Sequence, residues 1–230
     1  MLTWQNPLKN RLLAQLSEPE YLQFEPQLEL VMLQGGQILC EPCNQSRYGY
    51  FPVNCVVSLV GVSATSLYTP VAEIDEDGLV GLVRLLGKRE IPYHCVTLIS
   101  GAAYRARLDF LQAEFDIHGG FQRAALGYLQ LLMIQIAQSA ICIRRHSIEQ
   151  KICKTLLLGM DRVAGNEVEM TQQFVANMLG LRREDVTHAA RKLQDDGLLN
   201  YTRGRITILD RAGLEARVCE CYRLVRQLVC

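Results

Sequence analysis

The chain has 230 residues, 49% of them hydrophobic, with 24 basic and 24 acidic side chains. This length and apolar content allow one large domain or two modest ones. The balanced total charge argues against a nucleic-acid binder, but the charge is unevenly distributed. Residues 1–143 carry 9 Lys and Arg and 13 Asp and Glu, whereas residues 144–230 carry 15 and 11. The second part therefore has a modest positive excess, as expected if only that part meets phosphates.

The first residues lack a basic segment followed by an apolar run, so we expect no secretory signal. Nine cysteines without such a signal favour a reducing compartment and mostly free thiols. We therefore expect a cytoplasmic protein.

Residues 8–24 carry a weak helical pattern, and short β-rich runs separated by Gly, Pro, Asn and Asp follow up to about residue 107. Many short strands with frequent turn signals predict an antiparallel barrel or a double-sheet roll. The expected strands are residues 28–33, 37–40, 49–53, 56–62, 68–74, 94–99 and 102–106.

Helical patterns follow at residues 108–116, 119–143 and 147–163. Residues 124–143 hold no charged side chain, which is the length of a membrane span. Glutamines interrupt this stretch, however, and its apolar residues form a heptad seam with a second apolar side opposite. We favour a dimer helix over a membrane span. The expected interface residues are Leu126, Leu129, Met133, Ile136, Ala140 and Ile143.

Two short helical patterns meet at Gly180 within residues 171–191, which is the spacing of a helix-turn-helix. Ala176 is small enough for a close crossing, and Gly180 can adopt the positive φ of a tight turn. An ordinary helical hairpin is the alternative. The side chains expected to face outward can nearly all bond to a base edge or a phosphate. They are Arg182, Arg183, Glu184, Thr187, His188 and Arg191.

Gly197 is expected to end the second of these helices. Residues 198–201 and 205–209 then predict two short strands around Arg203 and Gly204. A helix-turn-helix followed by a basic hairpin is a winged helix, and Arg203 and Arg205 at its tip suit phosphate contact. A last amphipathic helix is expected at about residues 210–228.

This order of elements resembles the cyclic-AMP receptor/fumarate–nitrate reductase regulator (Crp/Fnr) family of bacterial transcription factors along nearly the whole chain. The segments that carry the resemblance are residues 33–39, 50–52, 56–59, 77–82, 146–152, 160–163, 178–187 and 201–211. The most specific are Met-Leu-Gly-Leu-Arg-Arg-Glu-Asp-Val-Thr at 178–187 and Tyr-Thr-Arg-Gly-Arg-Ile-Thr-Ile-Leu-Asp-Arg at 201–211.

The resemblance implies a homodimer paired through the long helix, with a recognition helix in the major groove of a two-fold symmetric operator. By position, Arg183, Glu184 and His188 fall where the family reads bases. His188 stands where better-known members carry an Arg or another polar residue, so a different half-site is expected. Double-stranded DNA is the expected partner. RNA polymerase and an unidentified small-molecule effector are further candidates.

Family members that bind cyclic nucleotides carry a Gly-Glu pair and, several residues on, an Arg followed by a small hydroxyl residue. Residues 78–94 contain no Gly-Glu pair, and Pro92-Tyr93-His94 occupies the place expected for the phosphate-binding Arg. The chain therefore resembles a branch without this motif, and we expect no cyclic-nucleotide response. Arg84, Lys88 and Arg89 are interpreted as solvated surface charge.

Cys40 and Cys43 have a chelating spacing, with Cys55 and Cys95 as further thiolates. Iron–sulfur members of the family instead cluster their cysteines near the N-terminus, so buried apolar roles are favoured here. A redox or metal role of these four cysteines stays open.

Three further cysteines, Cys219, Cys221 and Cys230, show no familiar ligand spacing. His146 is expected to cap or pack at a helix start. We expect no metal site and no cofactor.

The sequence has no Ser/His/Asp grouping, P-loop or dinucleotide fingerprint, so an enzyme is not expected. We expect an α+β protein with a β-roll at 1–118, a dimerisation helix at 119–145 and a winged helix at 146–230. Its expected function is sequence-specific transcription regulation by a homodimer on a palindromic operator. The alternative is a regulatory or interaction module that senses a small ligand, or redox state through its cysteines.

Overall fold

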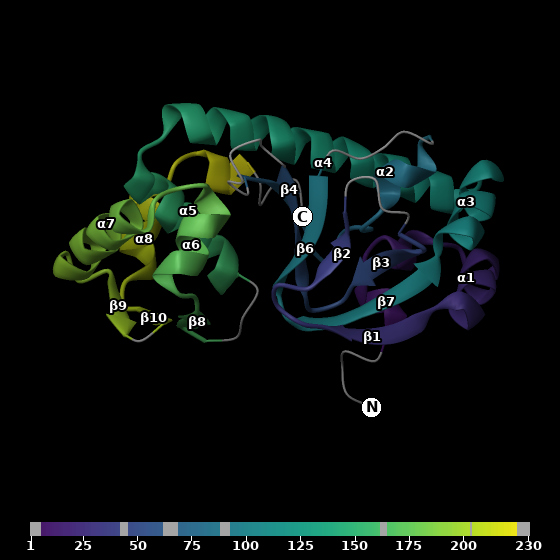
Figure 1. The fold of residues 1–230 in the computed structure, drawn as a ribbon, viewed down its shortest axis with the longest axis horizontal. Helices are drawn as coiled ribbons and strands as arrows, with labels where there is room; N and C mark the ends of the chain where they lie inside the picture. The colour runs from purple at the N-terminus through teal and green to yellow at the C-terminus, as the bar shows by residue number, and fades with distance from the viewer. Residues whose placement is uncertain are drawn as a thin grey trace. The chain divides into compact units, whose positions relative to one another are not determined.

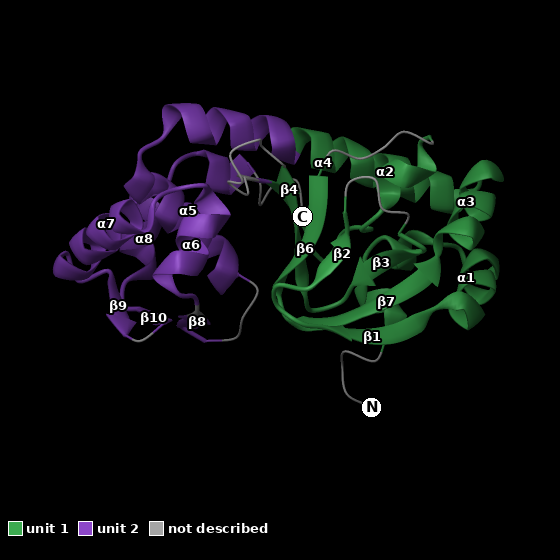
Figure 2. Cartoon of the chain, in the orientation of Figure 1, with its two compact units in different colours: residues 1–66, 71–134 green, residues 67–70, 135–230 purple. Residues whose placement is uncertain are grey.

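The computed structural model describes residues 6–41, 46–61, 69–87, 93–161, 165–202 and 204–224 (Figure 1). The chain forms two compact units (Figure 2). Unit 1 comprises Met1–Ser66 and Val71–Ile134, and unit 2 comprises Leu67–Pro70 and Gln135–Cys230. The long helix α4, Gly120–Arg145, contributes residues to both units.

Unit 1 begins with short helical pieces, where the sequence shows only a weak helical pattern. They are η2 (Pro7–Lys9), η3 (Leu13–Gln15), α1 (Glu18–Phe24) and η4 (Glu25–Gln27). Asn10 is fully buried between the first two pieces, and its amide donates hydrogen bonds to the carbonyl oxygens of Pro52 and Gly78. These bonds tie the N-terminal segment to the end of the strand at residues 48–52 and to the turn at residues 75–78.

Two antiparallel sheets form the body of unit 1, with strand orders β1-β7-β3 and β2-β6-β4-β5. Every expected strand is present, with ends shifted by at most a residue or two within the described residues, and the double-sheet roll is confirmed. The strands are β1 (Glu29–Leu33), β2 (Ile38–Cys40), β3 (Tyr48–Pro52), β4 (Val56–Gly61), β5 (Thr69–Ile74), β6 (Tyr93–Ile99) and β7 (Gly101–Arg107).

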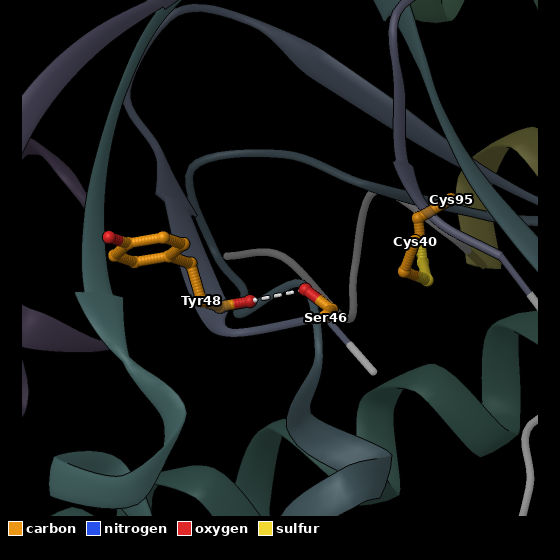
Figure 3. Close-up of a disulfide and its surroundings, with 4 residues drawn as sticks. All are labelled: Cys40, Ser46, Tyr48 and Cys95. Carbon is orange, nitrogen blue, oxygen red and sulfur yellow. Dashed lines mark hydrogen bonds between the residues drawn. A yellow bond between two sulfur atoms is a disulfide. The ribbon is translucent and has the colours of Figure 1, made fainter. Parts of the chain in front are cut away.

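A disulfide joins Cys40 of β2 to Cys95 of β6, which stand opposite each other with their Cα atoms 5.0 Å apart (Figure 3). The register of β2 on β6 brings these two side chains together. The other five cysteines among the described residues are free, in line with the expectation of mostly free thiols. Cys55 is buried and free, and burial raises its pKa to about 11. Cys43 lies outside the described residues.

Helix α3 (Leu108–Asp116) has the expected bounds, and α4 begins four residues after it. A left-handed residue, His118 with φ 61°, separates the two helices. The Glu20 carboxylate accepts a hydrogen bond from the backbone N–H of Gly120 at 2.5 Å. A carboxylate at the N-terminus of a helix is stabilised by the helix dipole, so Glu20 anchors the start of α4.

The turn before α2 (Leu82–Leu85) fixes α4 from a second side. The Tyr128 ring of α4 is buried directly against Gly78, and a Cβ atom on Gly78 would overlap the ring. Beside it, the Asp77 carboxylate pairs with Arg11 at 3.2 Å. Burial, reinforced by Asp75, raises the pKa of Asp77 to about 6 despite this partner.

Unit 2 continues after α4 with helices and a small sheet of order β8-β10-β9. Its elements are α5 (Ile148–Met160), β8 (Glu167–Glu169), α6 (Gln172–Leu179), α7 (Arg183–Asp195), β9 (Leu199–Thr202), β10 (Arg205–Ile208) and α8 (Arg211–Arg217). The sequence pattern did not indicate β8, which pairs with β10 over three residues.

The expectation of one continuous helix over residues 210–228 is wrong. Helix α8 ends at Arg217, because Val218 adopts an extended conformation with φ −69° and ψ 150°. The chain then turns and buries Cys219, Cys221 and Tyr222. The described residues 221–224 are helical again, so the expected helix is interrupted at residues 218–220.

Candidate nucleic-acid interface

Helices α6 and α7 form the helix-turn-helix that the sequence predicts. The Thr171 hydroxyl caps α6 by accepting a hydrogen bond from the Phe174 N–H at 3.0 Å. Gly180 ends the helix with φ 62°, and the next N–H, of Leu181, bonds back to the Ala176 carbonyl. The expected left-handed turn is confirmed, and Ala176 is fully buried in a core to which both α6 and α7 contribute.

One face of α7 is buried and the other carries polar side chains. Val186, Ala189, Ala190 and Leu193 form the buried face. The side chains on the opposite face recur at steps of three and four residues, which places them on one stripe of a helix. Exposed members of this stripe, with Arg182 immediately before the helix, are Arg183, Glu184, His188 and Arg191.

Thr187, the remaining predicted contact residue, is half-buried and already engaged. Its hydroxyl donates to the Gln172 side-chain oxygen of α6 at 2.6 Å and lies 2.9 Å from the Arg183 carbonyl. The residue thus connects the two helices of the motif. Gln172 was not singled out from the sequence, because its partner is fifteen residues away in the chain.

The wing is the hairpin of β9 and β10, in which Thr202 pairs with Arg205. Gly204 closes the turn with φ 84°, and a Cβ atom there would approach the Thr171 methyl group at the start of α6. Arg205 is exposed, with one guanidinium nitrogen 3.8 Å from Glu167 on β8. Arg203 lies outside the described residues.

Tyr201 attaches the wing to the helix-turn-helix. Its hydroxyl donates to the carbonyl of Met170, directly before α6, at 2.5 Å. Burial raises the pKa of Tyr201 to about 12, so the hydroxyl keeps the proton that this bond needs at neutral pH. The wing and α6 are therefore held together by a partly buried polar contact as well as by the core.

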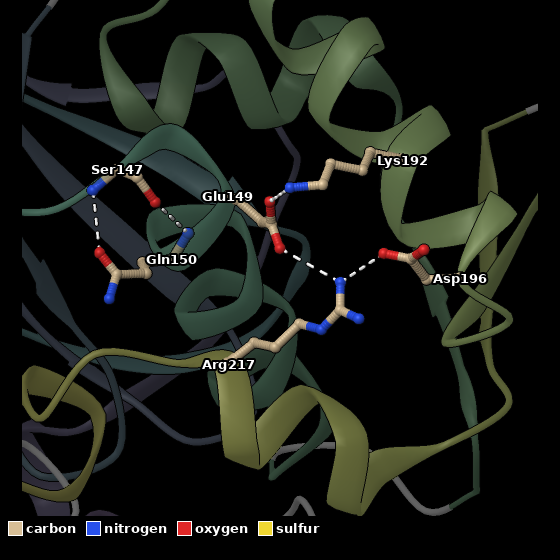
Figure 4. A network of polar contacts seen from close by, with 6 residues as sticks. All are labelled: Ser147, Glu149, Gln150, Lys192, Asp196 and Arg217. Carbon is tan, nitrogen blue, oxygen red and sulfur yellow. Dashed lines mark hydrogen bonds and ion pairs between the residues drawn. The ribbon is translucent and has the colours of Figure 1, made fainter.

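The C-terminal half of α7 is held by charged residues of α5 and α8 (Figure 4). Glu149 of α5 bonds to Lys192 of α7 at 2.7 Å and to Arg217 of α8 at 3.3 Å. Arg217 also contacts Asp196, the C-cap of α7, at 2.5 Å. Three helices thus share one ion network at the C-terminal end of α7.

Helix α4 carries an exposed apolar stripe. Of the predicted interface residues, Leu126, Met133, Ile136, Ala140 and Ile143 are exposed, and Leu129 packs partly on the core of unit 1. Met133 is 64% exposed and Ile143 54%. On the other sides of the helix, Tyr128 and Leu132 are buried. Among the described residues, α4 alone is long and apolar enough to cross a membrane.

Residues 150–217, which span α5 to α8, match the family model of the Crp-like helix-turn-helix domain. No curated protein sequence matches the chain.

Solved structures share the fold over most of the chain. A protein assigned to the crp/fnr family of transcriptional regulators, from Eubacterium rectale, has a TM-score of 0.75 and 16% identity, over 91% of this chain and 98% of that one. FixK2 from Bradyrhizobium japonicum has a TM-score of 0.70 and 15% identity, over 84% of this chain and 98% of that one. TTHB099, a CRP-family transcriptional regulator from Thermus thermophilus, has a TM-score of 0.71 and 16% identity, over 81% of this chain and 95% of that one.

Proposed function

Because the chain has the Crp/Fnr fold and carries a Crp-like helix-turn-helix domain at residues 150–217, we propose that it regulates transcription by binding a palindromic operator as a homodimer. The observation that carries this proposal is the exposed polar stripe of α7 opposite a fully buried face. A helix with this division can enter the major groove while its other side stays in the core.

Each exposed side chain of α7 has a role that its chemistry favours. Arg183 suits a bidentate contact with guanine, and Glu184 can accept a hydrogen bond from cytosine. His188, one turn after Glu184, is the third proposed base-reading residue. Arg182 and Arg191 lie at the two ends of the stripe, where phosphate contacts are expected. Arg203 and Arg205 of the wing supply further phosphate contacts in this proposal.

Pairing of two copies of the chain through α4 would give the two-fold symmetry that a palindromic operator requires. A second copy of the same stripe would cover the exposed side chains of Met133, Ile136 and Ile143. A two-fold axis through the paired helices would present two α7 helices to half-sites about 34 Å apart. We favour a second copy of the chain over a lipid bilayer as the cover of this stripe, because α4 belongs to a fold shared with transcription regulators. A cytoplasmic location and contact with RNA polymerase follow from the same proposal.

Cyclic nucleotides are not the proposed signal, because the chain lacks the Gly-Glu pair and the Arg that would hold the cyclic phosphate. A different small effector is compatible with the β-roll. The alternative role, a redox-sensing module, is favoured by the Cys40–Cys95 disulfide.

The test is selection of bound DNA from a random pool by the full chain. Enrichment of a two-fold symmetric sequence supports the proposal, and enrichment that is unchanged by added cyclic AMP or cyclic GMP supports the missing response. Absence of any enriched sequence, from protein with intact helical content, would contradict DNA-binding regulation and favour the module alternative. A single asymmetric half-site would contradict the homodimer.

A further inference from the structure

Three cysteines and a histidine of unit 2 come together at the C-terminal end of α4. Cys142 lies in the last turn of α4 and His146 follows it, while Cys219 lies in the turn after α8 and Cys221 begins the helical residues 221–224. The four potential ligand atoms all lie within 4.8 Å of one another. The three cysteines are buried and form a small cluster of their own, and the His146 side chain is only 10% exposed.

The spacing along the chain explains how two segments make one cluster. Cys142 and His146 are four residues apart, so the helical turn puts both on the same side, and the His146 N–H bonds to the Cys142 carbonyl. The extended Val218 ends α8 and turns Cys219 and Cys221 inward. Of the two roles expected for His146, packing at a helix start is the one observed, because its side chain is only 10% exposed and Ser147 is the N-cap of α5.

The distances match a tetrahedral metal centre. The Sγ atoms of Cys142 and Cys219 are 3.8 Å apart, and the Cys221 Sγ is 3.4 Å from the His146 Nδ1. A tetrahedral Zn²⁺ with Zn–S bonds of about 2.3 Å and a Zn–N bond of about 2.0 Å separates two sulfur ligands by about 3.8 Å, and sulfur from nitrogen by about 3.5 Å. The remaining pairs of ligand atoms lie within 4.8 Å.

The neighbours of the cluster are those that a ligating histidine and thiolate need. The His146 Nε2 is 3.2 Å from a Glu220 carboxylate oxygen, which leaves Nδ1 directed at the cysteines. A carboxylate on the second ring nitrogen fixes the tautomer and raises the basicity of a metal-binding histidine. The Gln138 amide donates a hydrogen bond to the Cys221 Sγ at 2.9 Å, which stabilises negative charge on that sulfur.

We propose that Cys142, His146, Cys219 and Cys221 bind one Zn²⁺ ion as a closed, four-ligand site. Three sulfurs and one imidazole nitrogen are a ligand set that zinc prefers, and a set of four buried protein ligands leaves no position for substrate. Binding displaces the three thiol protons to solvent and involves no change of oxidation state. The ion would fasten the C-terminal segment to the end of α4, a role beyond the proposed DNA binding.

The experiment uses the full chain purified under reducing conditions. Zinc content by mass spectrometry should approach one ion per chain. After removal of the metal, titration with Co²⁺ should give the strong visible bands and sulfur-to-metal charge transfer of a tetrahedral thiolate site, saturating at one equivalent. Zn²⁺ should bleach these bands.

Variants separate this site from general thiol binding. Replacing both Cys219→Ser and Cys221→Ser should abolish the Co²⁺ spectrum. Cys153→Ala, at a buried thiol of α5 outside the cluster, is the matched control and should keep it. Glu220→Gln changes a side chain that is 68% exposed and removes no ligand. It should retain one equivalent of metal while lowering Zn²⁺ affinity about 10-fold in competition with a chelator.

The proposal is overturned by full-length, folded and reduced protein that binds no stoichiometric Zn²⁺ or Co²⁺. It is also overturned if the double serine variant gives the wild-type Co²⁺ spectrum, or if reduced protein binds no metal and mass spectrometry of oxidised protein finds a Cys142–Cys219 disulfide instead. Because Glu220→Gln keeps the buried residues intact, an unchanged Zn²⁺ affinity in this variant counts against His146 as a ligand without any question of folding.

Discussion

Thr187 on α7 and Gln172 on α6 are joined by a side-chain hydrogen bond of 2.6 Å, which links the exposed stripe of the second helix to the start of the first. Thr187→Val keeps the shape and removes the donor, so it should lower the free energy of unfolding by about 1 kcal/mol. Thr187→Ser should restore most of this loss. Urea denaturation measures both. Unchanged stability with lost discrimination at one base pair would instead assign Thr187 to base reading.

Arg183→Ala should weaken binding to the selected operator by about 1–3 kcal/mol and relax the preference at one base pair. Binding to random DNA should change much less, because the lost contact is to a base edge. Arg47→Ala, at an exposed arginine of the β-roll, is the matched control and should leave both affinities unchanged. Equal losses on operator and random DNA would remove Arg183 from the base-reading set.

Arg205→Ala should weaken binding to all sequences alike, because a wing arginine contacts phosphate in this proposal. The slope of log affinity against log salt should fall by about one. Glu167→Gln removes the carboxylate 3.8 Å from this guanidinium and should leave the slope in place. A sequence-dependent loss in the Arg205 variant would show that the wing reads bases.

Ile136→Glu should convert a dimer into a monomer, because it places a charge in the middle of the apolar stripe of α4. Gln130→Glu changes an exposed residue of the same helix and is the control. Sedimentation equilibrium at micromolar concentration distinguishes the two states, and circular dichroism checks the fold. A wild-type protein that is monomeric with its fold intact would contradict pairing through α4.

The Asp77 carboxyl gives a pH dependence with a defined sign. Burial raises its pKa in the folded protein from 3.8 to about 6, so the folded state binds this proton more tightly than the unfolded state. Its contribution to stability is therefore complete below about pH 4 and is lost as the pH rises through 6. As the pH is raised from about 4 to 6, the free energy of unfolding measured by urea denaturation should fall less for Asp77→Asn than for the wild type. Parallel pH profiles of the two proteins would contradict the raised pKa.

Local patterns of the sequence were sufficient for most of the fold. The alternating strands of the β-roll, the helix at 108–116 and the Gly180 turn each follow from residues close together in the chain. Strand β8 was missed because three residues carry too little periodicity, and α8 was extended too far because its apolar pattern continues past Arg217.

The candidate sites were predictable only where their residues lie close together in the sequence. The exposed stripe of α7 follows from helical spacing, and its arginines are visible in the sequence. The cluster of Cys142, His146, Cys219 and Cys221 joins segments more than seventy residues apart, so neither segment alone shows a ligand pattern. The signal that could have found it is the four-residue step from Cys142 to His146 on a predicted helix.

The contact of Tyr128 with Gly78 fixes the rotation of α4 about its own axis, because position 78 has room for the hydrogen atom of glycine but not for a Cβ atom. A methyl group at position 78 would occupy the space of the phenol ring, and the helix could accommodate it only by turning or moving outward. Met133 lies five residues after Tyr128 on the same helix, so such a turn would also change the direction in which its exposed side chain points. The loop at residues 75–78 therefore determines which side of this part of α4 faces solvent.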